Sequence, residues 1–170
     1  MSEILDKFSG FLYIIPAVLI SLTLHELAHG FIAYKLGDPT AKEQGRLTLN
    51  PFKHLDLLGT IMMFVAHFGW AKPVPVNPLY FTGNRRRGMM LVALAGPIMN
   101  FFLSYLSVWG FKGILYGWLP QNEYFFAFFQ QMILTNMYLG VFNLLPVPPL
   151  DGSKILAGFG NEQFARGVYR

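Results

Sequence analysis

The sequence predicts an all-α polytopic membrane protein with three core transmembrane helices, a re-entrant segment and a short β-hairpin-like loop. Hydrophobic residues make up 54% of the 170-residue chain and charged residues 13%, about half the charged fraction of ordinary soluble domains. Several apolar stretches are long enough to cross a bilayer core of about 30 Å, which takes roughly 20 helical residues. No internal repeat or flexible linker divides the chain, so we expect one membrane-embedded domain over residues 1–170.

Three stretches are predicted to be the transmembrane helices: Phe11–Tyr34, Met89–Phe111 and Tyr124–Leu145. The second and third contain no charged residue, whereas the first holds His25, Glu26 and His29 in its interior. Ionisable groups inside a membrane are costly and usually functional. The first helix therefore needs a chemical explanation.

Leu57–Ala71 is apolar but would extend only about 22 Å as a helix. Gly59 and Gly69 weaken it further, so we expect a re-entrant or half-buried segment. Lys72–Pro78 is too rich in proline for a helix and is predicted to be an extended connector. The tail after Asp151 contains no further predicted span.

Basic residues predict the orientation of the chain in the membrane. They follow the first span and immediately precede the second, at Lys35, Lys42, Arg46, Lys53, Lys72 and Arg85–Arg87. The positive-inside rule places both groups in the cytoplasm, which three spans and one re-entrant segment satisfy. A four-span alternative would put one of these groups outside. The net charge of +4 does not indicate nucleic acid, because the basic residues form short clusters between apolar runs.

The segment His25-Glu-Leu-Ala-His29 matches the H-E-x-x-H pattern of zinc-dependent hydrolases. Four residues turn a helix by about 400° and advance it about 6 Å, so both imidazoles can share one tetrahedral ion. Glu26 lies about 100° away, where it can take a proton from metal-bound water. The chain has no cysteine, so a metal must use histidine and carboxylate ligands. The alternative is a polar cluster that packs between spans.

Two histidines leave a zinc site one protein ligand short. Asp151 is the candidate third ligand, because it follows three prolines that break the end of the last span. Unwound backbone at membrane depth is tolerated where it lines a cavity. The alternative is a proline turn that leaves the membrane with Asp151 in solvent. With Asp151 as the third ligand, we expect one Zn²⁺ per chain.

Three motifs together resemble the site-2 protease family of intramembrane zinc metalloproteases. They are His25–His29, Ala95-Gly-Pro-Ile-Met-Asn100 and Asn143-Leu-Leu-Pro-Val-Pro-Pro-Leu-Asp-Gly152, in the order in which the family has them. The resemblance implies a three-helix catalytic core with zinc held by His25, His29 and Asp151. It also implies hydrolysis of a transmembrane or membrane-associated protein substrate. Together with the orientation predicted by the basic residues, we expect a multi-pass protein of a prokaryotic cell membrane with the active site toward the cytoplasm.

The chain departs from the family pattern at two places. It ends 19 residues after Asp151, without the extra span of many compact relatives, which indicates a truncated or a minimal form. It also lacks an inserted PDZ or CBS domain, so substrate selection by such a domain is unsupported. The sequence leaves the substrate and the oligomeric state open.

Further residues are candidates for supporting roles. Gly96 and Asn100 share one helix face, and close helix packing with a hydrogen bond across it is favoured over direct catalysis. The Asn143 amide could fix the unwound segment or hold a substrate carbonyl. His54 and His67 have no metal-like spacing partner and are interpreted as structural.

The stretch Gly45–Asn50 alternates apolar residues and is followed by proline, which predicts a short strand and a turn. By resemblance it corresponds to the family's membrane-associated β-hairpin. Leu47, Thr48 and Leu49 would then offer an edge that holds the substrate extended before the zinc. The alternative is a connecting strand that closes the cytoplasmic face.

The alternative function is a non-proteolytic zinc-containing membrane protein that binds client helices. Glu26 argues against it, since a structural site needs no acid beside an open coordination position. A soluble zinc protease is excluded by the uncharged spans.

Overall fold

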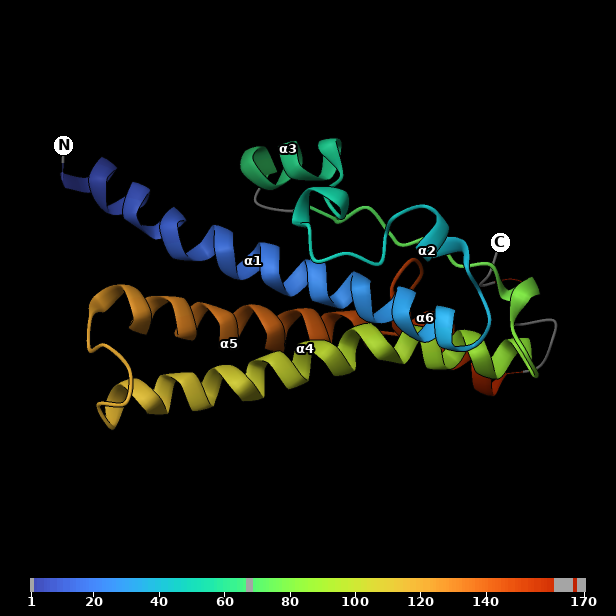
Figure 1. The fold of residues 1–170 in the computed structure, drawn as a ribbon. Helices are drawn as coiled ribbons and strands as arrows, with labels where there is room; N and C mark the ends of the chain where they lie inside the picture. Colours follow the sequence, from blue (N-terminus) through green and yellow to red (C-terminus); the bar gives the residue numbers. More distant parts are fainter. Residues whose placement is uncertain (1, 67–68, 161–166, 168–170) are drawn as a thin grey trace.

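Three long helices run side by side in the computed structural model, which describes residues 2–66, 69–160 and 167 (Figure 1). They are α1 (Ser2–Lys35), α4 (Arg85–Leu115) and α5 (Glu123–Asn143). Tyr13–Lys35 of α1 and the whole of α4 and α5 are long and apolar enough to cross a membrane. The prediction of three helices with the length and composition of membrane spans is confirmed.

The remaining elements are short. They are α2 (Thr40–Glu43), the 3₁₀ turns η1 (Pro51–Lys53) and η2 (Pro78–Tyr80), α3 (Leu57–Ala66) and α6 (Asp151–Phe159). All except α6 lie between α1 and α4 in the chain. Figure 1 shows α3 to one side of α1, away from α4 and α5.

Local signals determine where the long helices begin and end. Gly37 follows α1 with φ +106°, a left-handed conformation that glycine adopts without strain. A Cβ there would also lie 2.8 Å from the Tyr80 carbonyl oxygen. The Asn84 and Asn122 side chains accept the hydrogen bonds that cap the starts of α4 and α5.

Glycines let α4 and α5 approach closely. A Cβ at Gly110 of α4 would lie 2.1 Å from the Phe129 ring, and one at Gly140 of α5 would lie 2.8 Å from the Phe101 ring. The buried Ser104 hydroxyl also donates to the Ile133 carbonyl oxygen across the same interface, at 3.3 Å. Small residues and hydroxyls of this kind hold helices together where lipid removes the hydrophobic driving force.

The predicted strand at Gly45–Asn50 is wrong, because this stretch is an irregular loop. Its hydrogen bonds are local: the Thr48 hydroxyl accepts from the Asn50 amide at 3.2 Å, and His54 Nε2 donates to the Thr48 carbonyl at 2.9 Å. Such side-chain bonds compete with strand pairing, and the described part of the chain contains no strand beside this loop. Six alternating residues do not make a strand without a partner.

The segment expected to be re-entrant is a ten-residue helix, α3, in a loop that closes at its base. The Lys72 amide donates to the His54 carbonyl at 2.9 Å, and an isolated antiparallel bridge joins Leu55 to Ala71. The two ends of the segment that contains α3 therefore lie side by side, at Leu55 and Ala71. His67 lies outside the described residues. The following connector has no helix or strand until Asn77.

Candidate metal centre

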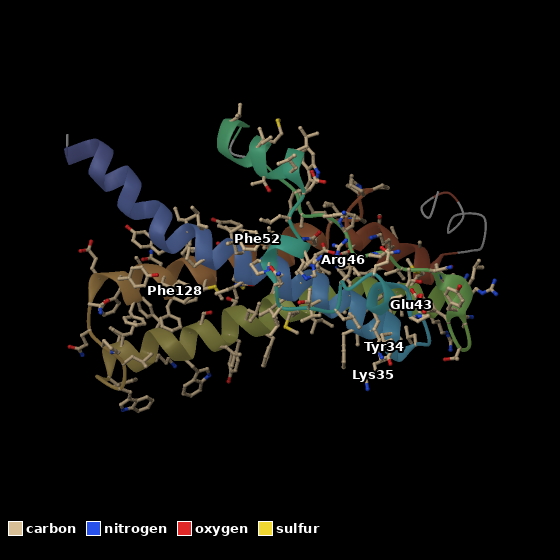
Figure 2. The ribbon with its side chains drawn as sticks, turned by 45° about the horizontal axis from the view of Figure 1, so that its top comes forward. Tyr34, Lys35, Glu43, Arg46, Phe52 and Phe128 are labelled. Carbon is tan, nitrogen blue, oxygen red and sulfur yellow. The ribbon has the colours of Figure 1, made fainter. Side chains whose placement is uncertain are left out.

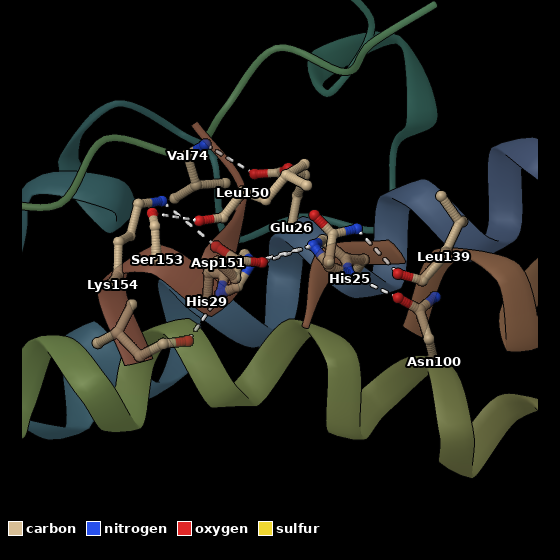
Figure 3. Close-up of polar contacts among 12 residues, drawn as sticks. His25, Glu26, His29, Val74, Asn100, Leu139, Leu150, Asp151, Ser153 and Lys154 are labelled. Atoms are coloured by element: carbon tan, nitrogen blue, oxygen red, sulfur yellow. Dashed lines mark hydrogen bonds and ion pairs between the residues drawn. The ribbon is translucent and has the colours of Figure 1, made fainter. Parts of the chain in front are cut away.

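Two imidazoles and one carboxylate converge where α1, α4 and α6 meet (Figure 3). His25 and His29 lie one turn apart on α1, and Asp151 is the first residue of α6. The two Nε2 atoms are 3.0 Å apart. Asp151 Oδ2 lies 3.3 Å from His25 Nε2 and 3.0 Å from His29 Nε2. All three side chains are buried.

The hydrogen bonds of the imidazoles explain why these atoms face one another. His29 Nδ1 is 2.7 Å from the Val92 carbonyl oxygen, and His25 Nδ1 is 2.5 Å from Asn100 Oδ1. Oxygen acceptors place the proton of each neutral ring on Nδ1, so each Nε2 presents a lone pair. Two lone pairs and a carboxylate oxygen then point into one buried space. Three electron-rich atoms this close together in a buried space are stabilised by a bound cation.

The residues present fit zinc by type and by spacing. Zinc takes histidine nitrogen and carboxylate oxygen in tetrahedral sites, where bond lengths near 2.0–2.1 Å place the ligand atoms about 3.3 Å apart. The observed separations are 3.0, 3.0 and 3.3 Å. Three protein ligands leave a fourth position for water or substrate, as in catalytic zinc sites.

Asp151 is in an environment that favours its ionised form. Burial opposes ionisation, but when no metal is bound the His25 and His29 imidazoles can donate from Nε2 to Asp151, and with the Lys154 ammonium they hold the pKa of the Asp151 carboxyl well below its usual range. Lys154 Nζ lies 3.3 Å from Asp151 Oδ1, on the side away from the histidines. The positive end of the α6 dipole adds to this effect. The carboxylate is therefore anionic at neutral pH.

The unwound chain between α5 and α6 brings Asp151 to the histidines. After Asn143 it folds back so closely that a Cβ at Gly152 would lie 2.2 Å from the Leu144 carbonyl oxygen. Only glycine fits behind the aspartate, which explains the Asp-Gly pair. Val147–Leu150 line the same cavity as Asp151. Asp151 is 6% exposed, so the solvated alternative is not what the structure shows.

Glu26 lies beside the three converging groups without belonging to them (Figure 3). Its Oε2 accepts a hydrogen bond from the Val74 backbone amide at 2.8 Å. Val74 belongs to the proline-rich connector, which passes over this end of the cavity. The Glu26 side chain is therefore held in place by backbone while it still faces the cavity.

The cavity that contains these groups has a volume of about 870 Å³. Its walls are largely apolar and come from α1, the connector, α4, α5 and the unwound segment, among them Leu22, Trp70, Val74, Met89, Leu139 and Phe142. Its polar side chains are His25, Glu26, His29, Asn143, Asp151 and Lys154. The space suits a short stretch of apolar polypeptide beside a metal.

Two of the predicted supporting residues lie directly behind the imidazoles. A Cβ at Gly96 would lie 2.4 Å from His29 Nε2 and 2.6 Å from His25 Cε1. Asn100, one turn further along α4, is fully buried and contacts His25 Nδ1. Asn143 lines the cavity, and its Nδ2 donates to the Leu139 carbonyl at 3.0 Å.

The predicted edge residues Leu47, Thr48 and Leu49 do not line this cavity. Leu49 instead borders a separate groove of about 230 Å³ against the outer face of α1. The connector that carries Val74 lies beside the metal centre, where Leu47–Leu49 were expected. His54 is 1% exposed and holds the loop at Thr48, in agreement with a structural role.

Sequence reasoning missed three groups at the site. Asn136 bonds to Asn100, the Val74 amide bonds to Glu26, and Lys154 pairs with Asp151. Lys154 could have been found, because a cation three residues after an aspartate at a helix start lies on the same face. Val74 acts through its backbone and leaves no side-chain signal.

The sequence profile of peptidase family M50 matches residues 13–121 and 108–166, which together include every group of the candidate site. The chain belongs to peptidase family M50. This membership confirms the resemblance to the site-2 proteases, and with the three apolar helices it makes the chain a multi-pass membrane protein. No solved structure matches the chain.

Several curated relatives are similar to the chain over most of its length. YwhC of Bacillus subtilis, provisionally named a zinc metalloprotease, is 45% identical over 152 residues, which is 85% of this chain and 67% of YwhC. Rip2 of Mycobacterium tuberculosis, also provisionally so named, is 38% identical over 84% of this chain and 55% of its own length. The zinc metalloprotease MJ0392 of Methanocaldococcus jannaschii is 24% identical over 85% of this chain and 33% of its own length. The chain thus spans about one third to two thirds of these relatives.

Proposed function

We propose that the chain is an intramembrane zinc metalloprotease that hydrolyses peptide bonds of membrane-spanning or membrane-associated proteins. The observation that carries this proposal is the convergence of His25, His29 and Asp151 beside Glu26 in one cavity. Membership of peptidase family M50 supports it, as do the names of the relatives. Glu26 distinguishes this function from a structural zinc site that binds client helices, which needs no acid there.

His25 Nε2, His29 Nε2 and Asp151 Oδ2 would hold one zinc ion per chain. Bound zinc supplies Lewis acidity, which activates water and polarises a scissile carbonyl. Glu26 is the general base. Because the Val74 amide holds its Oε2, Oε1 is the oxygen available to take the proton from the attacking water. Glu26 then returns that proton to the leaving amine nitrogen as the carbon–nitrogen bond breaks.

The cavity favours an extended, apolar substrate segment. A helical peptide bond keeps its carbonyl in a hydrogen bond and within a closed backbone, so the substrate must unwind locally before cleavage. The Asn143 amide uses one N–H on Leu139 and carries a second, which could hold the carbonyl of the unwound segment.

The orientation of the protein in the membrane is inferred from the basic residues near the C-terminal end of α1. Tyr34 and Lys35 lie at the end of α1, near Glu43 of α2 and far from Phe128 (Figure 2). The positive-inside rule places this basic end in the cytoplasm of a prokaryotic cell, and bacterial and archaeal relatives support that source. The exposed side chains of α3 that the structure describes, from Leu57 to Val65, are apolar, which supports a re-entrant segment in lipid.

A comparison of membrane proteins from cells with the native chain and with Glu26→Gln tests the function. The glutamine amide cannot accept a proton, so we expect uncut substrates to accumulate while the protein keeps its metal. Glu43→Gln on α2 is the control, because Glu43 is exposed and does not line the cavity. Identical cleavage products with Glu26→Gln would exclude Glu26 as the base. Client helices that co-purify equally with both chains, without cleavage by either, would favour the non-proteolytic alternative.

A further inference from the structure

A chain of buried amides runs from α5 through α4 to His25. Asn136 and Asn100 are both fully buried. Asn136 Nδ2 donates to the Met132 carbonyl at 2.8 Å, and Asn100 Nδ2 donates to Asn136 Oδ1 at 2.8 Å. Asn100 Oδ1 then lies 2.5 Å from His25 Nδ1. Three helices are thereby connected, and Asn136 is the member of this series that no charge or motif marks as functional.

The donor and acceptor of each hydrogen bond between these amides are determined at α5, where the series begins. The Met132 carbonyl can only accept, so the amide nitrogen of Asn136 must face it and the amide oxygen must face Asn100. The Asn100 nitrogen must then donate to that oxygen, which turns the Asn100 oxygen toward His25. A histidine nitrogen opposite an oxygen acceptor carries the proton. The ring is left with its lone pair on Nε2.

We propose that Asn136 is a positioning residue of the metal centre, which acts through Asn100 to fix the tautomer and the ring orientation of His25. The inference rests on the proposed zinc site. Its motivation is that the two histidines are oriented by different means. His29 Nδ1 faces the Val92 backbone carbonyl directly, and a backbone carbonyl has no alternative orientation. The Asn100 side chain could present either end to His25, and Asn136 removes that choice.

The alternative is that Asn136 only joins α4 to α5, as Ser104 does at Ile133. Both residues are buried polar groups in the same interface, so loss of either would weaken helix packing. Only Asn136 is connected to a candidate zinc ligand. Zinc affinity therefore distinguishes the two roles, whereas thermal stability does not.

The test measures Zn²⁺ affinity of the purified full chain in detergent, by competition with a chromophoric chelator. We expect Asn136→Leu to weaken zinc binding about 10–100-fold, the usual effect of losing an outer partner of a metal ligand. Ser104→Ala should bind as tightly as the native chain. If Asn136→Leu does not fold, Asn136→Ser replaces it, since the shorter side chain leaves Asn100 without its partner.

A rescue variant makes the test specific. Asn100→Asp puts two acceptor oxygens before His25 and needs no partner to orient it. The double variant Asn136→Leu with Asn100→Asp should therefore recover most of the zinc affinity that Asn136→Leu loses. Native affinity in both Asn136 variants, or no recovery in the double variant, would overturn the proposal. A native chain that binds no zinc would instead overturn the proposed function.

Discussion

At the residue scale, the site depends on its ligands and on the absence of a side chain at Gly96, behind the two imidazoles. H-E-x-x-H spacing places His25 and His29 on one helix face, because helix geometry alone fixes their relation. Gly96 was predictable as a packing residue from its place on the Asn100 face. The need for glycine comes from the imidazoles, which pack against its Cα. Asn136 could not be predicted, because an amide in an apolar helix carries no signature of its partner.

Gly96→Ala should abolish or strongly reduce zinc binding. Its Cβ would lie 2.4 Å from His29 Nε2, so the rings must move apart or α4 must withdraw from α1. Gly113→Ala on the same helix is the control, since its Cβ would meet the Leu119 side chain only at 3.3 Å. Metal analysis of both purified variants measures the difference. Full zinc content in Gly96→Ala would mean that the space behind the rings is not limiting.

At the element scale, the connector takes the place beside the metal centre that the sequence assigned to the loop before α3. The loop has the alternating pattern, but the connector is held at three points. Arg46 Nη2 donates to the Lys72 carbonyl at 2.7 Å, Val74 donates to Glu26, and the Asn77 amide donates to Asp38 at 2.6 Å. The composition of the connector predicted only that it would be extended. Its contacts depend on long-range placement that periodicity does not encode.

Asp38→Ala should loosen the connector without touching a metal ligand. Asp38 is fully buried and accepts hydrogen bonds from Asn77 and from the Thr40 amide and hydroxyl. Loss of these bonds should lower the free energy of unfolding by about 2–3 kcal/mol. Cleavage should fall, because Val74 no longer holds Glu26, while zinc content persists. Glu43→Ala on α2, an exposed acid, is the control for both measurements.

At the scale of the whole molecule, the long helices were predictable and their arrangement was not. Span lengths follow from hydropathy, and the ends of α4 and α5 lie within about four residues of the predicted ranges, whereas α1 begins at Ser2, well before the predicted Phe11. The short helix α6 was not predicted, because its nine residues are too few for the hydropathy signal of a span. Figure 1 shows the end of α1 and the start of α4 at one end of the bundle, and the α4–α5 connection at the other. This arrangement agrees with three spans.

Single cysteines at Glu43 and Arg85 should be labelled from the same side of the membrane. Both positions are exposed, and the native chain has no cysteine to interfere. A cysteine at Trp118, in the exposed turn between α4 and α5, should be labelled from the opposite side. A membrane-impermeant maleimide applied to intact cells and to inverted vesicles gives the answer. Labelling of Glu43 and Arg85 from opposite sides would require a fourth span.

The metal content of the purified chain tests the central claim most directly. We expect about one zinc per native chain, and a large loss in Asp151→Ala, because two histidines alone leave the ion weakly held. Asp56→Ala is the matched control, since that carboxylate caps α3 at Gly59 and lies outside the candidate metal group. It should retain the native zinc content. Undiminished zinc in Asp151→Ala, or a native chain that binds none, would contradict the account.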